Sequence, residues 1–273
     1  MQILVTNDDG IDSPGLLAMK TALDPLGDVM VIAPQENRSA IGRGITITRP
    51  LHVDERTLAD GSTGYAVDGT PVDCVRFASV GLVDGRVPDV VVSGINQGYN
   101  LGDDVTYSGT VAAAFEGLLL GLPAIAVSQG SLEGGHWHNG GSSYEFTFGA
   151  RFTARLVALM TAQDFLPRSL VSVNIPGIPP GAVSGVRVAR LGRRIYYDSL
   201  QLVDDGEDTR RRYVIYGDDP AHHPEDGTDF AAIEAGFISV TPIARDWTEF
   251  ASMEPFAALD LSAIAESVHE GMR

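Results

Sequence analysis

Cysteine is almost absent from this chain of 273 residues, in which Cys74 is the only one. A single thiol cannot form an intramolecular disulfide, so the fold has to be held together by its core. The composition permits this, because 44% of the residues are hydrophobic and a chain of this length can bury a sizeable core. Cys74 itself falls in a predicted helix, where we expect it to be a small buried residue.

Basic residues are also scarce: 19 Lys and Arg stand against 36 Asp and Glu, which gives a formal net charge of −17 at pH 7. Such a surface repels phosphate backbones and anionic lipids, so we expect neither a nucleic-acid polymer nor a membrane as a partner. A small anionic substrate would need a local positive centre instead. That centre could be a metal ion or a cluster of backbone amides.

Long apolar runs are missing as well. No segment approaches the roughly 20 uninterrupted apolar residues of a membrane-spanning helix. The first residues, MQILV, lack the basic and apolar regions of a secretion signal, so we expect a cytoplasmic protein. The Walker A loop, the GxGxxG fingerprint, the GxSxG elbow and the CxxC pair are also absent, which excludes the usual functions of those motifs.

What the chain does contain is an alternation of short apolar segments with helix-length segments. Strands are expected at 3–6, 28–34, 88–95, 123–128 and 169–176, and helices at 13–27, 109–121 and 146–165. This order predicts an α/β fold built from βαβ units, with a mostly parallel sheet and helices on both faces. Period-two alternation predicts a further strand at 45–53.

After residue 180 the pattern changes. The segments 185–205 and 210–217 alternate polar and apolar residues and are typical of antiparallel strands, and an amphipathic helix is expected at 257–273. We therefore predict a core at 1–180 and a C-terminal extension at 181–273 within one continuous domain.

Two adjacent carboxylates, Asp8 and Asp9, close the first predicted strand, and Gly10 follows them. In open α/β sheets ligands bind at the carboxyl ends of the strands, and Ser39 and Asn96 follow two other predicted strands. Paired carboxylates repel each other unless a cation neutralises them, and Mg²⁺ or Mn²⁺ takes such oxygen ligands. The pattern predicts one divalent metal ion held by Asp8, Asp9, Ser39 and Asn96. The alternative is a simple tight turn, because Asn, Asp and Gly are the usual turn residues.

A second candidate site opens the alanine-rich helix expected at 109–121. Ser108, Gly109 and Thr110 place two hydroxyls and a small residue where unpaired N–H groups and the helix dipole favour an anion, so they predict a phosphate cradle. An ordinary helix cap is the alternative. Asp103 and Asp104, just before it, could cap, orient Ser108, take part in acid–base chemistry or lie on a solvated loop.

Several long motifs occur in order: ILVTNDDGIDSPG, VIAPQENRSAIGRGITITRPL, VDGTPVDCV and PDVVVSGINQGYNLGDDVTYSGTVAAAFEGLLLGLPAIAVS. They resemble the SurE family of stationary-phase survival proteins, which act as metal-dependent 5′-nucleotidases. The resemblance is dense over 2–128 and resumes in VNIP and GTDFAAIEAGFISVTPI.

The resemblance implies a Rossmann-like core, a single divalent metal on the four ligands named above and phosphate binding by the turn at 108–110. Family members are dimers or tetramers whose C-terminal region is exchanged between subunits or packed across them. This implies a homodimer or homotetramer, with the extension at 181–273 as contact surface. The chain departs from the family pattern in a Gly- and His-rich loop at 134–141 and in AIGRG after Ser39, and both could alter substrate access.

The resulting hypothesis is hydrolysis of nucleoside 5′-monophosphates, with 3′-nucleotides and short polyphosphate as possible further substrates. The metal would polarise a phosphoryl oxygen and acidify the attacking water, and backbone amides at 108–110 would stabilise the equatorial oxygens. The expected catalytic residues are Asp8, Asp9 and Asn7, the last as an orienting group. Gly10 is expected to contribute to substrate binding. No residue is assigned as general acid.

Two other classes of protein remain open. A receiver-type signalling domain also carries an acidic pair after its first strand, but it is about half this length and needs a phosphoacceptor Asp that closes a strand. A non-catalytic nucleotide-binding or regulatory protein on the same sheet is the other alternative. Phosphorylation by a phosphodonor would identify the former, and nucleotide binding without turnover would identify the latter.

Overall fold

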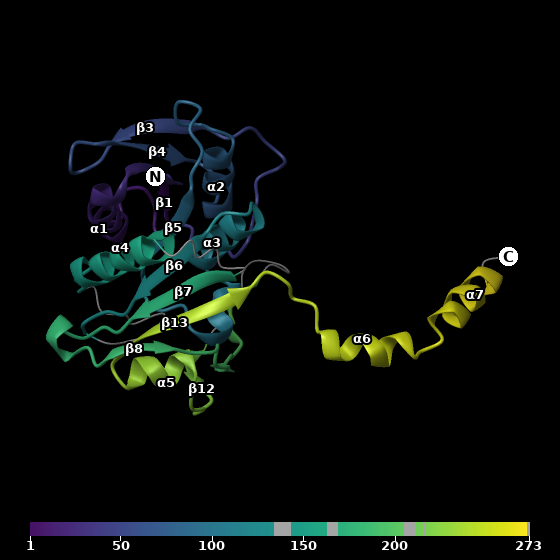
Figure 1. Ribbon diagram of the computed structural model, residues 1–273. Coiled ribbons are helices and arrows are strands. Elements are labelled where there is room, and N and C mark those ends of the chain that lie inside the picture. Colours follow the sequence, from purple (N-terminus) through teal and green to yellow (C-terminus); the bar gives the residue numbers. More distant parts are fainter. Residues whose placement is uncertain (134–142, 163–168, 205–210, 216, 272–273) are drawn as a thin grey trace.

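A nine-stranded sheet forms the centre of the molecule in the computed structural model (Figure 1), with strand order β3-β4-β2-β1-β5-β6-β7-β13-β8. The structure describes residues 1–133, 143–162, 169–204, 211–215 and 217–271. The bounds of the sheet strands are β1 Gln2–Thr6, β2 Asp28–Pro34, β3 Val53–Thr57, β4 Thr63–Val67, β5 Val90–Gln97, β6 Ala124–Gln129, β7 Ser169–Ile175, β8 Gly185–Val188 and β13 Phe237–Ala244.

The strands from β4 to β7 in this order are parallel, so their carboxyl ends share one edge. The edge strand β3 runs antiparallel to β4, and β13 runs antiparallel to β7. β1 lies between β2 and β5, with Ile3 opposite both Val29 and Val90. The turn that follows β1 is therefore close to the middle of the parallel sheet.

Helices cover both faces of this sheet (Figure 1): α1 (Pro14–Leu23) and α4 (Thr147–Ala162) on one, α2 (Pro71–Ser79) and α3 (Gly109–Leu119) on the other. Neighbouring strand residues point to opposite faces. Accordingly Ile3 belongs to the cluster under α1 and α4, and Leu4 to the cluster under α2 and α3. Both side chains are fully buried, and Cys74 of α2 is also buried, as predicted.

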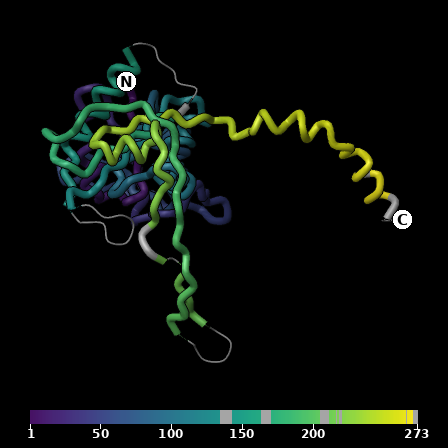
Figure 2. Tube along the Cα trace, turned by 90° about the horizontal axis from the view of Figure 1, so that it is seen from below, coloured from purple at the N-terminus to yellow at the C-terminus, as the bar shows by residue number. Residues whose placement is uncertain are grey.

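The chain beyond β7 returns to the sheet and then leaves it. Two small antiparallel sheets pair β9 (Arg194–Tyr197) with β12 (Asp218–His222) and β10 (Gln201–Asp204) with β11 (Arg212–Val214). Helix α5 (Asp229–Glu234) precedes β13. The β10–β11 hairpin and the C-terminal helices α6 (Phe250–Ala257) and α7 (Leu261–Gly271) project from the body (Figures 1 and 2). Short 3₁₀ turns occupy Asp24–Leu26, Gly102–Thr106 and Pro180–Ala182.

The predicted α/β fold is confirmed, and three local expectations need correction. Residues 45–52 form no strand: Ile45 and Ile47 are 57% and 81% exposed, and the Thr46 amide donates to Asp73 Oδ1 at the start of α2 rather than to a sheet. β8 runs parallel to β13 in the main sheet instead of in an antiparallel hairpin. The expected C-terminal helix begins at Leu261, and α6 was not predicted.

None of the helices in the described ranges is long and apolar enough to cross a membrane.

Candidate active site at the carboxyl edge of the parallel sheet

The turn after β1 is held by Asn7. Its Nδ2 donates to the Gly10 carbonyl oxygen over 2.9 Å, and the Gly10 amide donates back to Asn7 Oδ1 over 3.2 Å. Gly10 has a φ of +104°, which favours glycine. The predicted turn therefore exists, and both ends of the Asn7 amide are used to close it. In this position Asn7 supports the acidic pair, while its place among the catalytic residues stays a prediction.

Asp8 is joined to the start of α3 by a short hydrogen bond. Thr110 Oγ1 donates to Asp8 Oδ1 over 2.5 Å and also lies 3.4 Å from Asn96 Oδ1. The other end of the Asn96 amide is fixed, because Nδ2 donates to the Gly98 carbonyl oxygen over 3.0 Å. A carboxylate oxygen from the turn after β1 and an amide oxygen from β5 therefore meet at one hydroxyl of α3.

Gly109 allows this close approach. A Cβ built on Gly109 would lie 2.7 Å from Asp8 Cβ and 2.8 Å from Asp8 Oδ2, so a larger residue would displace the carboxylate. Ser108 is the N-cap of α3, with its Oγ accepting from the Val111 amide over 3.0 Å. The capping alternative is therefore confirmed for Ser108, and its phosphate-binding role stays a prediction.

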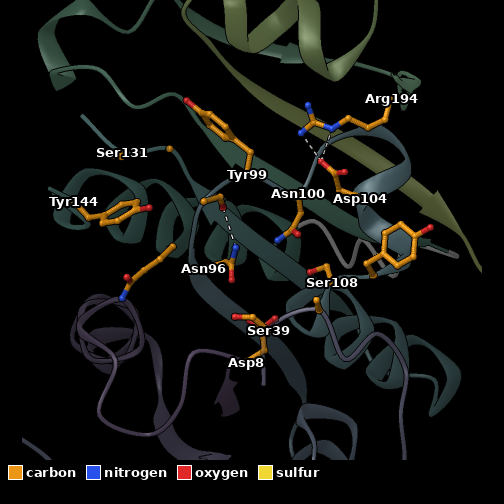
Figure 3. Close-up of a pocket in the computed structure, with 15 residues that line it drawn as sticks. Asp8, Ser39, Asn96, Tyr99, Asn100, Asp104, Ser108, Ser131, Tyr144 and Arg194 are labelled. Atoms are coloured by element: carbon orange, nitrogen blue, oxygen red, sulfur yellow. Dashed lines mark hydrogen bonds and ion pairs between the residues drawn. The ribbon is translucent and has the colours of Figure 1, made fainter. Parts of the chain in front are cut away.

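Ser39 is brought to the same place by the loop after β2. The Arg38 amide donates to the Asp8 carbonyl oxygen over 2.7 Å, and the Ser39 amide donates to Asn37 Oδ1 over 2.8 Å. Figure 3 shows Ser39 beside Asp8. The hydroxyl of Ser39 thus joins the side chains of Asp8 and Asn96 in the lining of one cavity.

Asp9 lies beside this cavity rather than in its lining. Its Oδ2 accepts from the Gln97 amide over 3.1 Å. Burial, followed by the charge of Asp8, raises the pKa of Asp9 to about 7, and burial also raises the pKa of Asp8. The Thr110 hydroxyl and the amides of Thr110 and Gly109 act in the opposite direction on Asp8. The two carboxyls therefore form a pair that a cation can stabilise in its charged form.

The cavity extends from Asp8 across the ends of β5 and β6 (Figure 3). Its lining combines residues expected at this edge with others from distant parts of the chain: Asp8, Ser39, Ala40, Asn96, Gln97, Gly98, Tyr99, Asn100, Asp104, Tyr107, Ser108, Gly130, Ser131, Tyr144 and Arg194.

Arg194 is a lining residue that no sequence pattern indicates. It enters from β9, and its Nε and Nη2 both donate to Asp104 Oδ2, over 2.8 and 2.5 Å. Both side chains are almost completely buried, and the guanidinium lies 4.6 Å from the Phe230 ring centre. Asp103 completes the anchor by accepting from the Arg194 amide over 2.7 Å. No local motif marks Arg194, because its partner lies 90 residues earlier in the chain.

Asp104 also orients the cradle. Its carbonyl oxygen accepts from the Ser108 amide over 3.1 Å and from the Tyr107 amide over 3.0 Å. Burial raises the pKa of Asp104, although the neighbouring Arg194 lowers it. Of the four roles considered for Asp104, the orientation of Ser108 is the one that these contacts support, and it acts through the backbone.

The donor chemistry of the site fits a hard divalent cation. Asp8, Asp9, Ser39 and Asn96 offer carboxylate, hydroxyl and amide oxygens, the ligand types that Mg²⁺ and Mn²⁺ prefer. Over the described ranges there is no cluster of three or more His, Cys, Asp and Glu side chains suited to a metal. A cation at this site would therefore depend on the neutral oxygens of Ser39 and Asn96 as well as on the acidic pair.

The fold and the site together define a class of protein: an α/β protein with an acidic pocket at the carboxyl ends of its parallel strands, beside the N-terminus of α3. The family model described as survival protein SurE matches residues 3–198. The chain belongs to the SurE family, as the resemblance of its motifs had predicted.

Curated relatives support this assignment over nearly the full length. The chain is 49% identical over 266 residues to a 5′-nucleotidase SurE from Rubrobacter xylanophilus, covering 97% of this chain and 99% of that one. It is 46% identical over 254 residues to a 5′-nucleotidase SurE from Chloroflexus aggregans, covering 93% and 97% of the two chains. A crystal structure of the SurE protein from Aquifex aeolicus matches with a TM-score of 0.74 and 35% identity, covering 93% of this chain and 98% of that chain.

Proposed function

We propose that this chain is a divalent-metal-dependent 5′-nucleotidase that hydrolyses nucleoside 5′-monophosphates to nucleoside and phosphate. The observation that carries the proposal is the meeting of Asp8 and Asn96 at Thr110, the second residue of α3, where Gly109 lets the carboxylate approach the helix. The names of the relatives support the same activity and favour it over a receiver domain or a non-catalytic nucleotide-binding protein.

In this proposal Asp8, Asp9, Ser39 and Asn96 hold one Mg²⁺ or Mn²⁺ ion. Such an ion supplies Lewis acidity to a phosphoryl oxygen and to the attacking water when it is bound. Asn7 and Gly10 keep the acidic pair in place through their mutual hydrogen bonds. Asp8 is itself buried and lines the cavity.

The start of α3 is the proposed phosphate cradle. The first amides of a helix have no partner within the helix, and its dipole favours an anion. Gly109 has no Cβ, so the Asp8 side chain lies against this first turn, and the proposal places the phosphoryl group beside it at these amides. During phosphoryl transfer the negative charge stays on the equatorial phosphoryl oxygens. Backbone amides that already point at these oxygens can therefore stabilise the transition state without having to move.

The test is phosphate release from adenosine 5′-monophosphate with Mg²⁺ or Mn²⁺, before and after chelation. Activity should disappear with chelator and return with added metal. Asp8→Asn should lose activity, whereas Asp12→Asn, an exposed carboxylate in the same segment, should keep it. Full activity of Asp8→Asn in metal-stripped buffer would refute the proposal. Nucleotide binding with no release of phosphate under saturating metal would favour the non-catalytic alternative. A panel of 3′-nucleotides and short polyphosphate would define the range of substrates.

We further propose that the chain forms a homodimer or homotetramer through its C-terminal extension. Helix α7 exposes Leu261, Ile264 and Val268, which recur on one helical face and are 51–60% exposed. Side chains on α6 and on the β10–β11 hairpin are similarly exposed, including Phe256 at 63% and Val203 at 59%. Apolar side chains on such projecting segments favour contact with another subunit. Sedimentation should give a dimer or tetramer, and Ile264→Asp should weaken it; a monomer at micromolar concentration would refute this proposal.

A further inference from the structure

Most polar side chains that line the active-site cavity already have partners within the protein. Asn100 Nδ2 donates to Ser128 Oγ over 2.8 Å, and Asp104 is paired with Arg194. The Tyr99 hydroxyl accepts from the Gly177 amide over 2.8 Å. These contacts hold the three side chains in place around the cavity.

Tyr144 differs from them. Its side chain is half-buried and lines the cavity, and no residue in the described ranges forms a hydrogen bond with its hydroxyl. Figure 3 shows this hydroxyl directed toward the cavity, across from Asp104 and Arg194. Tyr107 also lines the cavity, but it is 50% exposed and can remain hydrated. Tyr144 is the less exposed of the two and its hydroxyl points into the cavity, so it is the more suitable contact for a ligand.

The ring of Tyr144 is held firmly in this position. It stacks on Phe146, with ring centres 5.3 Å apart and planes within 3°, and Phe146 is buried in the core. The backbone on either side is tied to the end of β6. The Leu132 amide donates to the Ser143 carbonyl oxygen over 3.0 Å, and Gln129 Nε2 donates to the Glu145 carbonyl oxygen over 2.7 Å. Because the Tyr144 side chain is already ordered, it loses little conformational entropy when it contacts a ligand.

The surroundings of Tyr144 favour a neutral hydroxyl. Burial has the largest effect and raises the pKa of Tyr144, and the neighbouring carboxyl of Asp9 raises it further. A phenolate here would face the acidic pair, so transfer of its proton to a leaving group is disfavoured. The hydroxyl is suited to donating a hydrogen bond while it keeps its proton.

We propose that Tyr144 Oη donates a hydrogen bond to a sugar hydroxyl of the nucleotide substrate. The inference rests on the proposed nucleotidase function and adds a determinant of its specificity for nucleotides. With the phosphoryl group at Asp8 and the start of α3, the sugar is the part of the substrate that comes next, and the base lies farther away. Tyr144 thus favours a sugar phosphate over a phosphomonoester that has no hydroxyl at this position.

The experiment compares the full-length, metal-loaded protein with Tyr144→Phe, which removes only the hydroxyl and keeps the stacking on Phe146. Adenosine 5′-monophosphate, its 2′-deoxy and 3′-deoxy analogues and p-nitrophenyl phosphate serve as substrates. Tyr144→Phe should lower kcat/KM for adenosine 5′-monophosphate about fivefold, mainly through KM, because one neutral hydrogen bond is lost. It should leave p-nitrophenyl phosphate unaffected. In the unsubstituted protein, one of the two deoxy analogues should have a kcat/KM about fivefold lower than that of adenosine 5′-monophosphate. Tyr144→Phe should not lower kcat/KM for that analogue any further.

Two variants serve as comparisons. Tyr65→Phe removes a hydroxyl from β4, outside the cavity lining, and should change no substrate. Tyr107→Phe removes the hydroxyl of another tyrosine that lines the cavity. A sugar-dependent loss in Tyr107→Phe, with none in Tyr144→Phe, would overturn the inference. An equal loss on all substrates in Tyr144→Phe would also overturn it, as would no loss at all.

Failure of the nucleotidase proposal can be distinguished from failure of this inference. If the unsubstituted protein releases no phosphate from any substrate, the proposed function is wrong. Equilibrium binding of adenosine 5′-monophosphate with Mg²⁺ then tests Tyr144 directly, since the hydrogen bond is a binding contact. Weaker binding of adenosine 5′-monophosphate, but not of its matching deoxy analogue, in Tyr144→Phe supports the inference, and unchanged binding overturns it.

Discussion

The hydroxyl of Thr110 donates to Asp8 Oδ1 over 2.5 Å and so joins two residues that lie 102 positions apart in the chain. A threonine hydroxyl has a single proton, and the shorter contact uses it for Asp8 rather than for Asn96 Oδ1 at 3.4 Å. The bond fixes the rotation of the carboxylate, with Oδ2 on the side of Gly109. The acidic turn after β1 and the start of α3 therefore act as one unit.

Replacing Thr110 by valine should disconnect this unit without changing the volume of the side chain. Hydrogen bonds to charged groups contribute about 1.5–3 kcal/mol, so kcat/KM for a nucleoside monophosphate should fall at least about tenfold. Thr110→Ser keeps the hydroxyl and should retain activity within about threefold. Steady-state kinetics with saturating metal provides the measurement, and equal activity of the valine and serine variants would show that the hydroxyl does not position Asp8.

Replacing Gly109 by alanine should abolish activity while the fold survives. The added Cβ would lie within 2.8 Å of two Asp8 side-chain atoms, and the carboxylate would have to move. Gly109 is the first residue of α3 and has no positive φ, so alanine fits the backbone there and the thermal unfolding midpoint should stay close to its original value. Gly181→Ala is the matched control, because a Cβ there meets no atom within 4 Å. Wild-type activity in Gly109→Ala would contradict the close approach described here.

The main features of this unit could be predicted from sequence, because they depend on local rules. The apolar run of β1 ends at an Asn-Asp-Asp-Gly turn, and the parallel order places that turn beside Asn96 at the end of β5. Arg194 could not be predicted in the same way. Its burial depends on Asp104 and on Phe230, both distant in sequence, and its own segment resembles an exposed strand.

The strand predicted from the alternation at 45–53 was wrong for a related reason. Periodicity reports which side chains could face a core, but it does not supply the neighbouring strand that a sheet requires. In the structure Thr46 is bound to Asp73, and Thr70 Oγ1 donates to the Gly44 carbonyl oxygen over 2.8 Å. This loop therefore packs along the start of α2 instead of along a strand. Strand β3 begins only at Val53, which pairs with Val67 of β4.

Metal binding should strengthen with pH. In the metal-free protein the pKa of Asp9 is raised to about 7 from 3.8, so folding favours its protonated form. That contribution to stability is complete below about pH 4 and is lost as pH rises through about 7. A cation requires the charged form and must displace the proton. Its apparent affinity should therefore rise about tenfold per unit below pH 7 for one displaced proton and level off above it.

Calorimetric titration with Mg²⁺ or Mn²⁺ between pH 5 and 8 measures this effect, and the thermal shift on adding metal should grow over the same range. In Asp9→Asn the increase of metal affinity with pH should be smaller, because the proton of Asp9 no longer has to be displaced. An affinity that is constant from pH 5 to 8 in the unsubstituted protein would mean that no carboxyl proton is displaced, and the acidic pair would then not hold the metal.

The Asp104–Arg194 pair should be costly to break from one side. Arg194→Met leaves the Asp104 carboxylate buried without its partner, and such variants typically lose about 3–5 kcal/mol of unfolding free energy. Arg86→Met, which breaks the exposed pair with Asp84, should cost less than about 1 kcal/mol. Urea unfolding compares the two. The double variant Asp104→Leu/Arg194→Met removes both charges and should recover part of the stability. If it were as unstable as the sum of its single variants, the cost would lie in packing rather than in an unpaired buried charge.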